Sequence, residues 1–100
     1  MPKSRYAARK DANHAEIQAV FERCGCAVLD CSRYDGFVDL LVWRHEARLV
    51  EVKSPKGSLT PSQKSLVDKW PGKIHVVRHE DEALALVRAW DLEAAHQLPW

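Results

Sequence analysis

Two neighbouring segments in the middle of the chain are apolar apart from a few charged positions, which predicts two consecutive strands. Residues 37–43 and residues 47–53 are largely apolar, and Asp39, Glu51 and Lys53 are charged positions within them. Successive strand side chains point to opposite faces, so Glu51 and Lys53 share one face roughly 7 Å apart. Residues 44–46 are short enough to join the two strands as a hairpin. Pairing then brings Asp39 beside Glu51, with Lys53 next to them.

A helical period precedes these strands. Apolar residues recur at intervals of three and four, which predicts one buried helical stripe formed by Ile17, Val20, Phe21 and Cys24. The helix should begin near Asp11 or Asn13 and end at Gly25. Asn13 and Glu16 have the spacing of a capping box. Glu16 also borders the buried stripe, from where its carboxylate can reach a site on the sheet, and the sequence leaves both roles open.

The remaining pattern predicts four further elements. Residues 26–31 read as a first strand that ends in the turn residues 32–36, and residues 74–78 read as a short last strand. A helix should start at Thr60, because Thr60, Pro61 and Gln63 match an N-cap, a first helical turn and a capping box. A final helix should start at Asp81, with a stripe of Ala83, Leu86, Val87 and Trp90.

The order of these elements predicts a single α/β domain. Helix, three strands, helix, strand and helix follow one another, with two short connections and then one helical crossing. Short connections favour antiparallel pairs and a helical crossing favours a parallel pair, so we expect a mixed sheet with helices on its faces. We expect a basic arm over residues 1–10, the domain over residues 11–90 and a tail over residues 91–100.

Composition agrees with a globular domain of 100 residues, of which 46% are hydrophobic and 29% charged. No apolar run has the ~20 residues that cross a bilayer, so we expect no membrane association. Residues 1–10 lack the apolar segment of a signal peptide, which makes cytoplasmic residence our expectation. The three cysteines do not have the spacing of a redox pair or a zinc site, and we interpret them as small buried residues.

Basic residues are concentrated in two parts of the chain, although the net charge is only +1. Such clusters are compatible with phosphate binding, and equally with a solvated surface. Arg33 in the turn after the first strand and Lys56 after the third are placed to meet a nucleic-acid backbone. The arm carries four bases and no acid: Lys3, Arg5, Arg9 and Lys10.

Asp39 and Glu51 would place two carboxylates together on adjacent strands. Such a pair is unfavourable unless a cation or a proton neutralises it. Mg²⁺ suits the pair, because it takes one or two carboxylates and keeps other positions for water and phosphate oxygens. A solvated ion pair between Glu51 and Lys53 explains the same residues equally well.

Taken together, these residues resemble a known family. Asp39 followed by Glu51-Val52-Lys53, with Glu16 on a preceding helix and Gln63 after the motif, is similar to the PD-(D/E)XK nuclease superfamily. Within it the pattern resembles the small VRR-NUC and Holliday-junction-resolvase-like nucleases, over roughly residues 11–86. The family places a proline before the metal-binding aspartate, and this chain has Val38 there.

The resemblance implies a restriction-endonuclease-like core of order α-β-β-β-α-β and Mg²⁺-dependent hydrolysis of DNA, with Mn²⁺ able to substitute. It implies that Asp39, Glu51 and the Val52 carbonyl hold the metal, and that Lys53 serves the attacking water or the transition state. Glu16 would assist, and Gln63 would steady Lys53 or the phosphate. It also implies a homodimer acting on branched DNA.

Two other function classes remain open from the sequence. One is a catalytically silent DNA-binding module of the same fold, although all three motif charges are intact. The other is a structural or regulatory protein in which the charges form a surface ion network.

Overall fold

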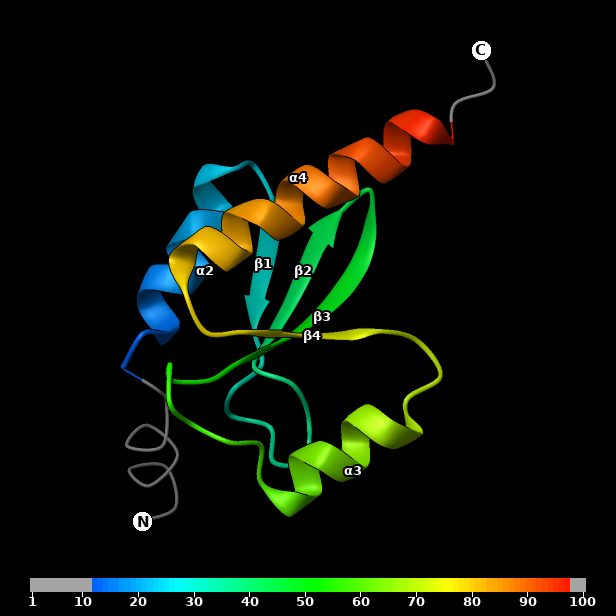
Figure 1. Cartoon of the computed structure of the whole chain (residues 1–100). Coiled ribbons are helices and arrows are strands. Elements are labelled where there is room, and N and C mark those ends of the chain that lie inside the picture. The colour runs from blue at the N-terminus through cyan, green and yellow to red at the C-terminus, as the bar shows by residue number, and fades with distance from the viewer. Residues whose placement is uncertain (1–11, 98–100) are drawn as a thin grey trace.

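The order of helices and strands is the predicted one (Figure 1). The structure is a computed structural model, and it describes residues 12–97. Its elements are α2 (His14–Arg23), β1 (Ala27–Asp30), β2 (Leu40–Arg44), β3 (Glu46–Val52), α3 (Pro61–Lys69), β4 (Ile74–Val77) and α4 (Glu80–His96). Within this part of the chain, no helix is long and apolar enough to cross a membrane.

The four strands form one mixed sheet in the order β1-β2-β3-β4, which confirms the predicted α/β class. β1 pairs with β2, and β2 with β3, in antiparallel fashion, whereas β3 and β4 are parallel. The parallel pair follows from the crossing through α3, since a helical connection returns the chain to the same end of the sheet. The mixed sheet therefore follows from the lengths of the connections between strands, which can be predicted from the sequence.

The limits of the two central strands differ from the prediction. The hairpin between β2 and β3 is closed by His45 alone, at φ 66, and not by the three residues 44–46. β2 begins at Leu40 and not at residue 37, because Phe37 is held in a turn in which its N–H donates to the Tyr34 carbonyl at 3.3 Å. Asp39 consequently lies just before the strand.

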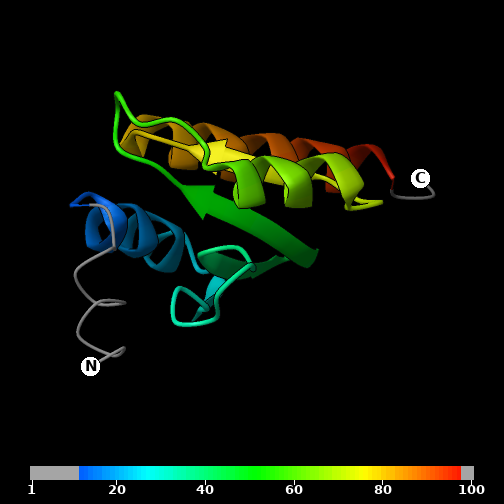
Figure 2. The ribbon, with the colours of Figure 1, turned by 90° about the horizontal axis from the view of Figure 1, so that it is seen from below.

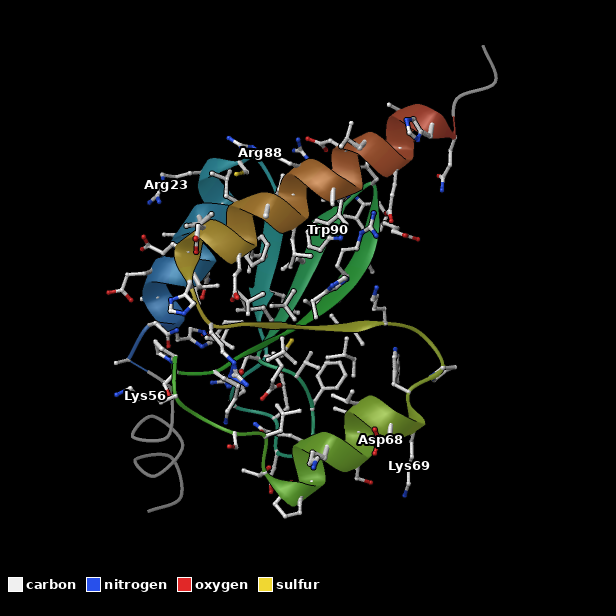
Figure 3. All side chains as sticks on the ribbon, viewed as in Figure 1. Arg23, Lys56, Asp68, Lys69, Arg88 and Trp90 are labelled. Carbon is white, nitrogen blue, oxygen red and sulfur yellow. The ribbon has the colours of Figure 1, made fainter. Side chains whose placement is uncertain are left out.

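The hydrophobic core lies between one face of the sheet and the helices α2 and α4. The stripe predicted for the first helix is buried there through Ile17, Val20 and Phe21. Trp90 on α4 is 2% exposed and stacks on Phe21 with 5.9 Å between ring centroids. Figure 3 shows Trp90 directed from α4 towards the strands. Burying these side chains supplies the main stabilisation of the fold.

α3 lies on the opposite face of the sheet. Val50 and Val52 belong to the core beneath α2 and α4, so Glu51 between them points the other way, where it meets a side chain of α3. Seen from below, α3 stands in front of β4 and α4 behind it (Figure 2). α3 has no buried residue, in contrast to α2 and α4. Polar contacts at its first turn therefore matter for its position.

α4 is longer than the sequence pattern predicts. Residues 91–96, which the sequence assigns to a tail, continue the helix to His96. Arg44 explains the first turn of this extension, because its guanidinium donates to both oxygens of Asp91 at 2.9 and 3.0 Å. The same guanidinium donates to the Cys24 carbonyl at 3.0 Å and so links α2, β2 and α4. This bidentate pair holds the pKa of the Asp91 carboxyl at about 2.

The cysteines have the predicted structural character. All three are free; Cys26 and Cys31 are buried and Cys24 is partly buried. Burial raises the pKa of the Cys26 and Cys31 thiols, which disfavours reactive thiolates.

Candidate active site

Asp39 and Glu51 lie side by side where β2 begins. Leu40 pairs with Val50 in the antiparallel register, so the residue before Leu40 meets the residue after Val50. Asp39 Oδ2 accepts a hydrogen bond from the Val52 N–H at 2.8 Å. Glu51 is 2% exposed and is, with His14, one of two buried polar or charged residues in the described part of the chain. The predicted pair of adjacent carboxylates is thus present in the structure.

The pair is electrostatically unfavourable when both groups are ionised. Burial, and then the neighbouring Asp39 carboxylate, raise the pKa of Glu51 to about 8, against the opposing effect of the Lys53 ammonium. Without a cation, the pair therefore favours sharing one proton over carrying two full negative charges. A divalent cation placed between the two carboxylates would replace that proton.

Gln63 connects Glu51, Lys53 and the start of α3. Its side-chain amide donates to Glu51 Oε2, while its Oε1 accepts from Lys53 Nζ at 3.3 Å and from the Thr60 N–H at 2.8 Å. The Thr60 hydroxyl accepts from the Gln63 N–H at 3.2 Å, which completes the predicted capping box. Gln63 thus takes part in the cap of α3 and also contacts the side chains of Glu51 and Lys53.

These residues fit Mg²⁺ by the chemistry of their donors. Asp39 and Glu51 supply two carboxylates, and the Val52 carbonyl is a third oxygen ligand of the kind this ion takes. Within residues 12–97 no group of three His, Cys, Asp or Glu side chains is arranged to hold a metal. An ion here would keep several positions for water and phosphate oxygens, which is the usual environment of Mg²⁺ and differs from a closed structural site.

A cavity of about 460 Å³ opens onto this cluster. Asp39, Lys53 and Gln63 line it, together with the hydroxyl residues Thr60 and Ser62 at the start of α3. The loop between β1 and β2 contributes further lining residues. Asp39, Lys53 and Gln63 therefore face a space in which a substrate can bind, whereas Glu51 is not among the lining residues.

Glu16 lies outside this cavity. It is exposed on α2 and lines a second cavity together with Arg78 and His79. The capping box expected between Asn13 and Glu16 is wrong, since Asn13 makes no side-chain cap hydrogen bond. The structure does not bring Glu16 together with Asp39 and Glu51.

Asn13 instead joins the ends of two strands. Its side-chain amide donates to the Lys53 carbonyl at 3.0 Å and to the Arg78 carbonyl at 2.8 Å. These partners are 40 and 65 residues away along the chain. Sequence reasoning missed this role because the Asn13-to-Glu16 spacing offered a local explanation, and no local signal marks a contact across such distances.

The predicted phosphate-binding residues are spread over the surface. Arg33 and Lys56 are exposed on the loops that follow β1 and β3. Figure 3 shows Lys56 directed outward from the loop between β3 and α3. Neither residue lines the cavity with Asp39. The four bases of the arm lie outside the described residues: Lys3, Arg5, Arg9 and Lys10.

No family model, no curated protein and no solved structure matches this chain. The functional argument therefore depends on the geometry of the site.

Proposed function

We propose that this protein is a metal-dependent endonuclease that hydrolyses DNA phosphodiester bonds, as the resemblance to PD-(D/E)XK nucleases implies. One observation carries the proposal: Asp39, Lys53 and Gln63 line one cavity, and the amide of Gln63 also donates to the buried Glu51 carboxyl. An ion network on a solvated surface would not explain why Glu51 is 2% exposed beside a second carboxylate.

Each residue has a role that follows from its position. Asp39, Glu51 and the Val52 carbonyl would hold Mg²⁺, which when bound polarises a phosphate and lowers the pKa of its water. Lys53 lines the cavity, so its ammonium can orient the attacking water or offset negative charge that develops on the phosphate. Gln63 holds the Lys53 ammonium through Oε1 and the Glu51 carboxyl through its amide, and thereby fixes their relative positions.

Branched DNA as substrate and pairing of two copies belong to the same proposal. An exposed apolar surface on β1 and β2 supports pairing, because Leu29 is 57% and Trp43 58% exposed. Both side chains lie on the face that α2 and α4 leave uncovered, since Val28 and Val42 pack against the core on the other face. A second copy seated there would extend the surface available to DNA.

The position of Glu16 favours a second candidate, a DNA-binding module of this fold without turnover. Glu16, the third acidic residue of the pattern, does not line the cavity of Asp39 and lines a different one. Both candidates require metal and DNA binding, and they differ in whether Lys53 acts on a reacting phosphate.

The deciding experiment is a cleavage assay on linear and branched DNAs with Mg²⁺, Mn²⁺ or chelator. We expect metal-dependent cleavage by the parent, and a metal-dependent rise in its melting temperature. Asp39→Asn should lose both effects. Lys53→Met should keep the thermal response, since the metal ligands remain, and should lower kcat by roughly 100-fold or more.

Asp35→Asn is the matched control, because Asp35 lines the same cavity without being a proposed ligand. It should retain cleavage and the thermal response. If Asp39→Asn responds to Mn²⁺ as the parent does, the metal site lies elsewhere. A parent that binds DNA and cleaves none of the substrates would establish the binding module in place of the enzyme.

A further inference from the structure

The lining of the cavity over the candidate site is chemically mixed. Asp39, Lys53 and Gln63 contribute polar groups, and Tyr34, Phe37 and Leu66 contribute apolar surface. Its volume of about 460 Å³ lies in the range of small-molecule binding sites. A ligand that fills it must therefore offer both a charged part and an apolar, flat part.

Tyr34 presents an aromatic ring that the described part of the protein leaves uncovered. The side chain is 57% exposed at the cavity, whereas its backbone is fixed. The Tyr34 N–H donates to the Cys31 carbonyl at 2.9 Å, and the Tyr34 carbonyl accepts from Phe37. Within residues 12–97, ring-to-ring contacts are confined to Trp90 and its neighbours beneath α4. The backbone of Tyr34 is thus anchored, and its ring has no aromatic stacking partner among the described residues.

We propose that the cavity receives one nucleotide whose base has left the helical stack and lies on Tyr34, so that the substrate carries unpaired nucleotides at the cleavage point. This inference rests on the proposed nuclease function and names its substrate class. A nucleotide has both parts: its phosphate faces Lys53, and its base faces the ring of Tyr34. Aromatic rings stack on any base without reading sequence, so the preference is for DNA structure.

Paired DNA does not meet these requirements. Bases in a continuous duplex are stacked within it and reach a protein pocket only after unstacking and unpairing, which costs free energy. Unpaired nucleotides in a loop, a flap or a single strand avoid that cost. The cavity should therefore discriminate between paired and unpaired DNA through Tyr34.

The charges of the cavity add a condition. Among the described residues that line it, Asp35 and Asp39 carry carboxylates and Lys53 alone carries an ammonium, so without a metal this lining is more acidic than basic. A phosphate is repelled by such a wall. Entry of the nucleotide should therefore require a divalent cation as well as an unpaired base.

The test uses oligonucleotides that carry the fluorescent base 2-aminopurine, whose emission falls on stacking. The protein is the full chain with Lys53→Met, which suppresses turnover and keeps the metal ligands, so that the bound cation rather than the Lys53 ammonium attracts the phosphate. With Mg²⁺ we expect quenching when 2-aminopurine is unpaired and little change when it is paired. Adding Tyr34→Ala should weaken the unpaired complex about tenfold and remove the quenching, whereas Tyr34→Phe should preserve both.

Two controls separate stacking from other effects. Tyr34→Leu keeps an apolar side chain without an aromatic face, and it should behave like Tyr34→Ala. Trp70→Ala removes a ring that is 41% exposed at the end of α3 and does not line the cavity, and it should leave binding unchanged. In the parent background, Tyr34→Ala should lower kcat/KM about tenfold on unpaired DNA and leave cleavage of duplex unaffected.

Equal binding of paired and unpaired DNA, or quenching that survives Tyr34→Ala, would overturn the inference while leaving the nuclease proposal intact. Quenching that depends on Tyr34 in a protein that cleaves no DNA would support the inference and overturn the nuclease proposal.

Discussion

Glu51 is the residue whose protonation should dominate the pH dependence of folding. Its pKa in the folded protein is about 8, above the ordinary value of 4.5, because it is buried beside Asp39. Between these two pH values the folded state binds more protons than the unfolded state. Its contribution to stability is therefore full below pH 4.5 and is lost as the pH rises towards 8.

Glu51→Gln should remove this dependence. Relative to the variant, the free energy of unfolding of the metal-free parent should fall by on the order of 3 kcal/mol between pH 5 and pH 8. Urea unfolding at both pH values measures the difference, and other titrating groups cancel in the comparison. At pH 8, Mg²⁺ should raise the free energy of unfolding of the parent, and it should raise that of Glu51→Gln to a smaller extent. If the free energies of unfolding of the two proteins depend on pH in the same way, the pKa of Glu51 is not raised in the folded state.

At this scale the sequence predicted individual residues well where strand alternation decides the outcome. Asp39 and Glu51 are adjacent because antiparallel pairing leaves little freedom once both strands are recognised. Gln63 shows the limit: its capping role follows from three neighbouring residues, whereas its bonds to Glu51 and Lys53 depend on how α3 packs. Local spacing carries no information about that packing.

Among the elements, α2 is tied to the sheet by a contact that its own pattern does not reveal. The amide of Asn13 donates to the carbonyls of Lys53 and Arg78, at the ends of β3 and β4. Two carbonyls in part-buried positions would lose their donors if this side chain were removed. Lys53 is one of them, so the same bond helps to position the strand end that carries the proposed catalytic ammonium.

Asn13→Ala should lower the free energy of unfolding by about 1–3 kcal/mol. Chemical denaturation measures this, and Glu16→Ala is the control because Glu16 is exposed on the same helix. The control should remain within about 0.5 kcal/mol of the parent. Equal losses in the two variants would favour a general effect on the start of α2. Loss of cleavage by a stable Glu16→Ala protein would instead support its predicted catalytic role.

The order of elements was predictable, and their limits less so. The hydrophobic period predicted the helices and strands, and the lengths of the connections predicted the mixed sheet, because both are local properties of the sequence. The hairpin closes at His45, and α4 extends through Asp91, for reasons that lie in other elements. Arg44 is 47 residues from Asp91, and the pattern after Trp90 does not indicate such a partner.

For the whole molecule, DNA binding should depend on basic residues of the arm and of the surface loops. The arm adds four bases in its ten residues, and Arg33 and Lys56 are exposed on loops of the domain. Contacts of this kind release counterions from DNA and carry no sequence information.

Deleting residues 1–10 should weaken binding to all DNA sequences and reduce the slope of log K against log salt concentration by up to about 3–4. Titrations of the Lys53→Met protein at several salt concentrations measure the slope. A second variant keeps the length of the arm and should behave like the deletion. In it, glutamine replaces the four bases of the arm: Lys3, Arg5, Arg9 and Lys10. An unchanged slope in either variant would show that the arm does not contact phosphates.

α3 has no buried residue and is joined to the site by the side chain of Gln63. Its outward surface can accordingly accumulate substitutions at little cost to the hydrophobic core, provided that Thr60 and Gln63 are kept. Such an arrangement separates two kinds of evolutionary constraint. Selection for folding acts on α2, α4 and the strands, whereas selection for a new substrate can act on α3 and the loop that faces it, so this wall of the cavity can diversify without loss of stability.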